Sequence, residues 1–439
     1  MMPETATQPR KAKPQKGPSS VPSSAVAGIN WLRRIVAAMF IVTIIITWKL
    51  WISDRSYPLI PVLEWLPQIP PPFDYILPAI LLAALAAAAL MRNPRWPIRI
   101  VLVAGLLVAL FDLTRWQPYI LHYLVILGSL LLLPWERRER WTKEDLEWGL
   151  MPVYMLLGFT YLYSGLQKFN HEFIGWVFGW MLEPMMGWLD IPPPEFSRPL
   201  LTTLAIIAAI IETTGGLLLF FRRTRRPAAI ALIGMHLFIL VMLGPLGRVT
   251  NHAVWPWNIA MIATLWLLFV SRNAPDVALA ERLFRGAWWK SVTGGRGGTL
   301  PSRAHALGAG MALFFFGMLP TLNFVDMWDS YLSFSIYSGM IHNGRIHMVP
   351  EDQLLLPPYM KEQFGEDGGF DPTQWAIREL IAAPYPEPRA MIRMGRELAR
   401  RAQHSDVYVQ IGGRPNIITG KRTIDVFRCP RGGGEPVKD

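Results

Sequence analysis

A lysine stands where a long apolar run ends. Lys168 closes about twenty mostly apolar residues, within the sequence YLYSGLQKFNHEF at positions 161–173. In a bilayer its ammonium would lie at the border between hydrocarbon and water, a costly position that often marks function, although lysines that merely reach for headgroups are about as common there. A half-dry pocket disfavours the charged form of a lysine, and the amine can then act as a general base. We therefore take Lys168 as the candidate catalytic base.

Further polar residues should lie at the same membrane depth as Lys168. Tyr119 and His122 are three positions apart at the start of another apolar run, so they share a helix face, and either is a candidate catalytic partner of the base. The candidate substrate-binding residues are Arg115, Asn170, His171, Asn251, His252 and Trp257. The alternative is an interfacial belt of aromatic residues in which each histidine is only a satisfied hydrogen bonder.

Two ionisable residues lie deeper, near the middle of apolar runs. Glu212 would be expensive there without a partner, and His236 has a comparable depth in the next run. We expect a structural hydrogen bond between the two; protonation of Glu212 and contact with a ligand are the alternatives. No metal is expected, because the histidines lack metal-ligand spacing, and the single cysteine, Cys429, excludes an intramolecular disulfide and a cysteine-based metal cluster.

These residues depend on membrane helices for their positions. The chain is 52% hydrophobic, and apolar runs recur as far as residue 325, which predicts an all-α polytopic membrane protein with the lipid bilayer as its main partner. Nine spans are expected, at residues 30–52, 74–91, 96–112, 117–135, 147–168, 199–221, 227–247, 254–271 and 304–324.

The connections between these spans alternate in charge. Basic residues gather in the N-terminal tail and at positions 92–99, 137–143, 222–226 and 272–303, whereas the intervening connections carry few. Basic loops face the cytoplasm, so we expect the N-terminus inside and the C-terminal residues outside, as in a multi-pass protein of a bacterial inner membrane. Much of the net charge of +11 lies in these loops beside anionic headgroups, which argues against a nucleic-acid partner.

The chain divides into three parts. Residues 1–29 are too polar to fold and form a disordered cytoplasmic tail, residues 30–324 form the transmembrane domain, and residues 325–439 form a small α+β extracytoplasmic domain. In that last domain we expect a strand at 328–337, a hairpin turn at 342–344, helices at 374–383 and 389–403, and strands at 407–411 and 423–427.

The sequence gives no support for the common enzyme classes of soluble proteins, because it lacks the GxGxxG, P-loop, GxSxG and HExxH patterns. The motif small-Gly-x-x-Lys-apolar-Asn-x-x-aromatic at residues 164–173 instead resembles the HTTM family, the membrane portion of vitamin K-dependent gamma-carboxylases and their bacterial relatives. Residues 112–119, and His236 followed by Trp255-Pro256-Trp257, resemble two further family segments. This resemblance, over about residues 30–324, implies a reduced, vitamin K-like quinone as cofactor and Lys168 as the base that deprotonates it.

The chain also departs from that family. It has Tyr119 where the carboxylases carry a functional histidine, with His122 one turn later, and its outer domain of about 115 residues is far smaller than the one that holds their protein substrate. Carboxylation of peptide glutamate is therefore disfavoured, whereas proton abstraction from a quinol-like, lipid-soluble molecule is compatible with the sequence. The alternative function is a non-catalytic membrane subunit or maturation factor for a redox partner, similar to DoxX-like and MauE-like proteins.

Overall fold

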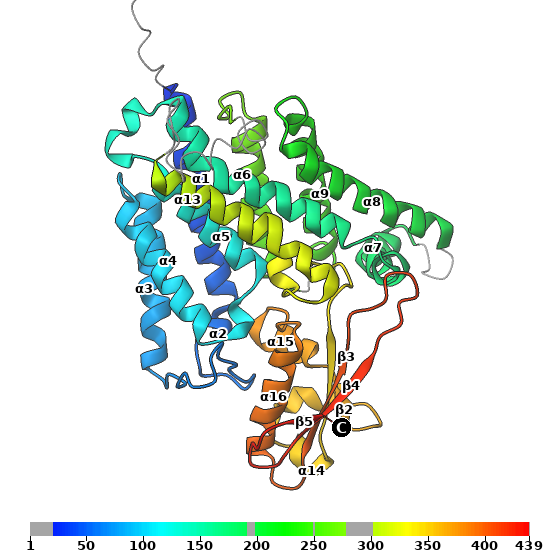
Figure 1. Ribbon diagram of the computed structural model, residues 1–439. Coiled ribbons are helices and arrows are strands. Elements are labelled where there is room, and N and C mark those ends of the chain that lie inside the picture. The colour runs from blue at the N-terminus through cyan, green and yellow to red at the C-terminus, as the bar shows by residue number, and fades with distance from the viewer. Residues whose placement is uncertain (1–20, 191–197, 249–250, 278–301, 439) are drawn as a thin grey trace, which may run out of the picture.

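The protein is a helical bundle with a small α+β domain at one end (Figure 1). A computed structural model describes residues 21–190, 198–248, 251–277 and 302–438. Of the tail predicted at residues 1–29, residues 1–20 lie outside the described residues. The rest of the prediction is wrong, because helix α1 begins at Ser23 and not near residue 30. Of the basic segment at 272–303, residues 278–301 also lie outside the described residues.

Within the described residues, six helices are long and apolar enough to cross a membrane. They are Ser23–Ile46 (α1), Phe73–Leu90 (containing α3, Ile76–Leu90), Lys143–Leu166 (α6), Arg198–Leu219 (α8), Arg225–Leu243 (α9) and Arg303–Val325 (beginning with α13, Arg303–Ala312). Two shorter apolar helices, Pro118–Leu132 (α5 and a 3-10 turn) and Val254–Val270 (α10 and a π-helical turn), and the 16-residue α4, Arg95–Leu110, occupy the other three predicted spans. An integral membrane protein is therefore supported, with six helices of spanning length where nine spans were expected.

Helix α6 forms the centre of the bundle. Of its most apolar stretch 83% is buried, against 28–44% in the other five long helices. Glycines let α8 approach α6 closely: a methyl group on Gly216 would meet the backbone of Leu162 and lie 2.7 Å from the carbonyl oxygen of Gly158. Small residues commonly mediate such close helix contacts in membranes. The side chains on these two helices are consequently held at short range.

The C-terminal domain is an antiparallel sheet covered by helices. Its strands are β1 (Asn343–His347), β2 (Gly369–Phe370), β3 (Val407–Gly412), β4 (Ile424–Cys429) and β5 (Val437–Lys438), in the order β2-β1-β3-β4-β5. The helices are α14 (Pro350–Gln353), α15 (Pro372–Leu380) and α16 (Pro388–Arg401). Met391, Met394 and Leu398 form one buried stripe of α16, as expected for an amphipathic helix. The predictions of both longer helices and of strands near 407 and 423 are confirmed.

Two local predictions in this domain are wrong. Residues 328–337 form no strand but a 3-10 turn, Tyr331–Ser333, followed by irregular backbone in which Phe334 and Tyr337 have φ of 61° and 51°. Such positive φ values are incompatible with a strand. The expected turn at 342–344 is instead the beginning of β1, which pairs with β3 from Asn343 to His347.

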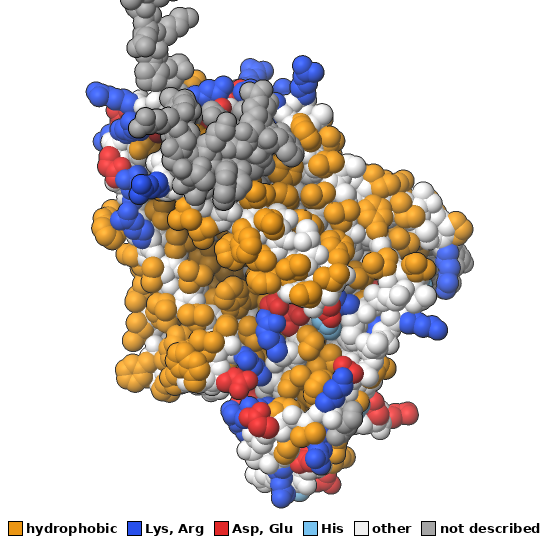
Figure 2. Space-filling model, viewed as in Figure 1, with side chains coloured by type: hydrophobic (Ala, Val, Ile, Leu, Met, Phe, Trp, Pro, Cys, Tyr) orange, Lys and Arg blue, Asp and Glu red, His pale blue; other side chains and the backbone are white. Residues whose placement is uncertain are grey.

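The C-terminal domain rests on the loop between α2 (Trp48–Trp51) and α3. Glu379 on α15 accepts hydrogen bonds from the backbone N–H groups of Ser56 (2.6 Å) and Tyr57 (3.1 Å). Arg393 on α16 donates to the carbonyl oxygens of Pro61 and Val62. Figure 2 shows hydrophobic side chains covering the helical bundle, with many Lys and Arg side chains at the end opposite the C-terminal domain and others, mixed with Asp and Glu, on that domain.

Candidate ligand cavity

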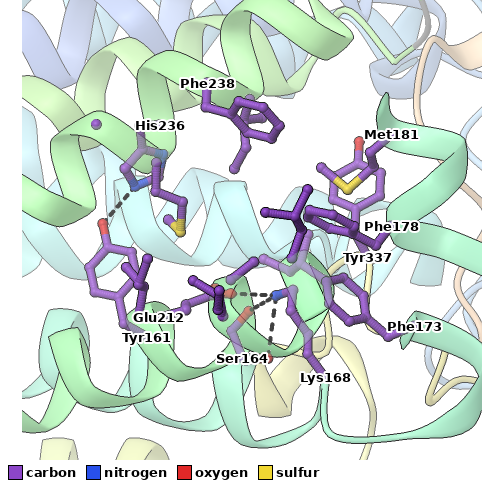
Figure 3. Close-up of a pocket in the computed structure, with 18 of the residues that line it drawn as sticks. Tyr161, Ser164, Lys168, Phe173, Phe178, Met181, Glu212, His236, Phe238 and Tyr337 are labelled. Carbon is purple, nitrogen blue, oxygen red and sulfur yellow. Dashed lines mark hydrogen bonds and ion pairs between the residues drawn. The ribbon is translucent and has the colours of Figure 1, made fainter. Parts of the chain in front are cut away.

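A cavity of about 580 Å³ lies among α6, α8, α9 and α7 (Phe178–Trp188). Most of its wall is apolar, and Figure 3 shows aromatic and methionine side chains facing the space opposite Lys168, Glu212 and Ser164. The apolar lining includes Phe173, Phe178, Met181, Leu182, Met185, Leu204, Ile207, Ile211, Met235, Phe238 and Ile239. Two residues from the start of the C-terminal domain, Ile336 and Tyr337, complete the wall.

An ion pair forms the first polar group of this wall. The Lys168 ammonium lies 2.7 Å from a carboxylate oxygen of Glu212, and the two side chains are 10% and 9% exposed. The ammonium also donates to the hydroxyl (2.8 Å) and the carbonyl oxygen (3.3 Å) of Ser164, one turn earlier on α6. Its three protons thus all have acceptors within the protein, and the contact with the Ser164 carbonyl oxygen is the longest of the three.

A hydrogen-bonded chain forms the second polar group. Asn258 donates its amide N–H to the carbonyl oxygen of Val254, which turns its side-chain oxygen towards His236. His236 Nδ1 lies 2.6 Å from that oxygen and therefore donates to it. Nε2 consequently accepts from the hydroxyl of Tyr161 at 2.7 Å. Tyr161 and His236 line the cavity, and Asn258 fixes the imidazole tautomer from behind.

The expected hydrogen bond between Glu212 and His236 is therefore wrong. Both residues are buried in the cavity wall, but Glu212 pairs with Lys168 and both ring nitrogens of His236 have other partners. The reason is geometric: the close contact of α6 with α8 brings Lys168 nearer to the carboxylate than α9 brings its histidine.

The candidate partners Tyr119 and His122 lie outside the cavity. His122 bonds Thr160 (2.9 Å) and the carbonyl oxygen of Pro118 (2.6 Å), and its ring packs against Trp257 and Phe334. Thr160 and Trp257 line the cavity, so His122 stands behind its wall. Tyr119 is buried, and its hydroxyl has no hydrogen-bond partner among the residues that the structure describes.

Among the candidate substrate-binding residues, only Trp257 lines the cavity. Arg115 donates to the carbonyl oxygens of Leu50 and Val108, and so ties together helix ends. Asn170 accepts from the backbone N–H of Phe173 as a helix cap, and the N–H of His171 donates to the carbonyl oxygen of Ile417. Asn251 and His252 border a separate hollow of about 350 Å³ beside the C-terminal domain.

Sequence reasoning missed most of the cavity residues, among them Tyr161, Ser164 and Tyr337. Ser164 and Tyr161 precede Lys168 by four and seven positions, so helical periodicity alone could have placed all three on one face of α6. Tyr337 carries no such signal, because it reaches the cavity from a distant, irregular segment. Within the described residues, no group of three histidine, cysteine or acidic side chains could hold a metal ion.

A DoxX family model matches residues 150–245, the segment from the first turns of α6 to just past the end of α9. All the residues lining the cavity fall within this match except Trp257, Ile336 and Tyr337. No curated protein and no solved structure matches the chain. The comparisons thus support the resemblance to DoxX-like proteins that the sequence suggested. They give no support to the resemblance to the carboxylases.

Proposed function

We propose that the protein is a DoxX-like membrane subunit that binds a lipid-soluble ring compound of the quinone class and supports a redox partner. The observation that carries this proposal is the cavity, which combines a volume of about 580 Å³ with apolar walls and a few polar groups. Small-molecule sites typically have this character, with volumes of about 300–1,000 Å³. The family match adds support because it covers the helices that build the cavity.

The ion pair suits both redox states of such a ring. A quinone carbonyl needs a hydrogen-bond donor, and a quinol hydroxyl needs an acceptor. The Glu212 carboxylate keeps room to accept from a quinol hydroxyl, and the Lys168 ammonium, 2.7 Å away, donates to a quinone carbonyl by turning one proton from its 3.3 Å contact with the Ser164 carbonyl oxygen. Tyr161 and His236 offer a second polar position for another ring oxygen.

The remaining walls suit an apolar tail and entry from the bilayer. Met181 and Met185 are flexible side chains that adapt to irregular apolar ligands. Ile207 and Ile211 line the cavity and are 44% and 42% exposed, and they belong to the candidate membrane span α8, of whose most apolar stretch only 28% is buried. A ligand dissolved in the bilayer would therefore enter sideways between helices rather than from water.

Filling the cavity tests this proposal. Gly234 lines the cavity, and a methyl group added there would meet nothing within 4 Å, so Gly234→Leu is expected to occupy ligand space without straining α9. Gly28 on α1 is equally unobstructed but lies outside the cavity, which makes Gly28→Leu the matched control. The protein would be purified in a mild detergent, and its retained lipophilic molecules identified by mass spectrometry.

We expect a prenylated ring compound in the wild type and in Gly28→Leu, and a loss of about tenfold or more in Gly234→Leu, as for an affinity loss above 1.4 kcal/mol. Equal retention by all three proteins would place the ligand elsewhere. A wild type that retains no ring compound, even when quinone is added during purification, would refute binding of this class.

Lys168 in the cavity wall favours a second candidate, an enzyme that deprotonates a quinol-like substrate, as the carboxylase resemblance implies. The ammonium would first pass a proton to Glu212, leaving a neutral amine that takes the proton of the quinol hydroxyl. Lys168→Arg separates the candidates, because a guanidinium donates hydrogen bonds but does not serve as a base. The subunit proposal expects quinol-dependent activity of membranes within a few-fold of wild type; a collapse of that activity with the ligand still retained would favour the enzyme.

A further inference from the structure

Two isoleucines stand out at the tip of the hairpin between β3 and β4. Ile417 is 49% exposed and Ile418 is 84% exposed. Single exposed apolar residues are common on proteins and mean little by themselves. We define the hairpin tip as residues 416–421. Its contacts with the rest of the protein indicate why these two isoleucines are exposed.

The hairpin tip lies against the end of a candidate membrane span. The backbone N–H of His171 donates to the carbonyl oxygen of Ile417 at 2.9 Å, and His171 follows closely after Leu166, where α6 ends. Gly420, at φ 67°, lies so close to the His171 ring that an added methyl group would be 2.5 Å from Nδ1. Figure 1 shows the hairpin reaching from the C-terminal domain to α7.

The segment that follows His171 in the chain has the composition of a membrane interface. Trp176, just before α7, is 62% exposed, and Trp188 at the end of α7 is 51% exposed. Tryptophan prefers the headgroup level of bilayers. Lys421 at the hairpin tip is also exposed, and lysines there reach anionic headgroups while nearby apolar groups enter the hydrocarbon.

The hairpin tip is already ordered for such a contact. The side-chain oxygen of Asn416 accepts hydrogen bonds from the backbone N–H groups of Ile418 and Thr419, both at 3.0 Å. The backbone N–H of Asn416 donates to the carbonyl oxygen of Lys421 at 2.9 Å. A closed turn of this kind presents Ile417 and Ile418 without further loss of conformational entropy.

We propose that the hairpin tip inserts Ile417 and Ile418 into the lipid leaflet on the side of the C-terminal domain, as a second membrane attachment of that domain. The attachment lies close to the ligand cavity. Arg422, next to the hairpin tip, donates to the carbonyl oxygens of Gly339 (3.2 Å) and Ile341 (2.7 Å), in the segment that carries Tyr337. The lipid contact thus anchors the same segment that completes the cavity wall.

Depth-dependent fluorescence quenching tests the insertion. The only cysteine, Cys429, is buried and is replaced by alanine, and Ile418→Cys is labelled with bimane in the full chain. The protein is reconstituted into vesicles of phosphatidylcholine and phosphatidylglycerol, with a nitroxide on the upper acyl chain of some lipids. Ile424→Cys on β4 is the matched control, because Ile424 is 61% exposed on the same hairpin but lies away from its tip.

We expect nitroxide lipids to quench the label at 418 at least about twofold more strongly than the label at 424, and aqueous iodide to show the reverse order. Equal lipid quenching at the two sites, or stronger iodide quenching at 418, would overturn the proposal. Thr419→Cys repeats the measurement at the next position, in case labelling at 418 perturbs the hairpin tip.

Discussion

The pair of Lys168 and Glu212 explains how two charged residues are tolerated in an apolar wall. Each neutralises the other, and Ser164 satisfies the remaining ammonium protons. Removing one partner of a buried pair leaves an uncompensated charge, which typically costs about 3–5 kcal/mol, whereas replacing both partners with apolar residues is often neutral. The pair is therefore expected to matter for stability as well as for ligand contact.

This asymmetry gives a prediction. Glu212→Gln should lower the melting temperature clearly, because it strands the Lys168 ammonium, and the double variant Lys168→Met with Glu212→Leu should recover most of the loss. Thermal unfolding of the wild type, the single variant and the double variant in one detergent would measure both effects. A single variant as stable as wild type, or a double variant worse than the single, would contradict the pairing.

At the residue scale the sequence anticipated part of this site. Lys168, Glu212, His236 and Trp257 were all singled out, and all line the cavity. Their partners were not predictable, because the pairing depends on which helices touch. Asn170 is instructive: it accepts from the backbone N–H of Phe173 as an N-cap does, but residues 170–198 were expected to be a connection, so the helix that it caps was not predicted.

At the element scale, the contact of α6 with α8 positions the cavity. A methyl group on Gly216 would collide with the backbone of α6, which has no freedom to move aside, whereas one on Gly234 would meet nothing. Overpacking commonly costs about 1–3 kcal/mol, and replacing an unhindered helical glycine by alanine gains about 0.5–1 kcal/mol.

The same substitution should therefore act oppositely at these two positions. Gly216→Ala is expected to lower the melting temperature and to weaken ligand retention, whereas Gly234→Ala should leave stability unchanged or slightly raised. Both are measured by thermal unfolding together with the retained-ligand assay. Equal destabilisation by both variants would mean that α6 and α8 are not packed through Gly216.

The junction of α14 with the end of α16 should respond to acid. Burial raises the pKa of Asp352, but hydrogen bonds from the backbone N–H groups of Gln403, His404 and Ser405 and from the His404 ring outweigh this effect and lower the pKa to about 2. Since the folded pKa lies below the unfolded one, the stabilisation is complete above about pH 4 and is lost as the pH falls towards 2, with roughly 2 kcal/mol at stake.

Pepsin is active in the pH range in which Asp352 takes up its proton, so pepsin cleavage can measure the loss of stability at this junction. In wild type, cleavage between α14 and α16, mapped by mass spectrometry, should become easier as the pH falls from about 4 to about 2. Asp352→Asn should be cleaved readily across this range with little pH dependence. A variant that shows the same pH profile as wild type would assign the acid response to other groups.

The same scale shows where sequence patterns succeed. Long apolar runs identify the membrane helices, and amphipathic periodicity identifies α15 and α16. The alternation of apolar and polar residues at 328–337 wrongly predicted a strand, because the apolar side chains do not share one face. Phe334 packs on His122, whereas Tyr337 lines the cavity. Backbone with positive φ at these non-glycine residues is set by tertiary contacts, which local sequence does not encode.

At the scale of the whole molecule, the C-terminal domain and the basic loops that the structure describes, at 92–99, 137–143 and 222–226, lie at opposite ends (Figure 1). The charge alternation predicts that this domain faces away from the cytoplasm. A reporter that is active only in the cytoplasm, fused after Asp439, should stay dark, and the same reporter placed before Ser23 should be active. Strong activity of the C-terminal fusion would mean that an odd number of the three shorter helices does not cross the membrane.

The central claim is that a quinone-class ring occupies the cavity between α6 and α9. A photoreactive quinone added to the protein in bilayer nanodiscs, with its adducts mapped by mass spectrometry, tests this claim most directly. We predict adducts on cavity residues such as Met181, Met185 and Phe238, which excess unlabelled quinone suppresses and Gly234→Leu abolishes. Adducts confined to the lipid-facing surfaces of α3 and α4, or unchanged by the competitor, would contradict it.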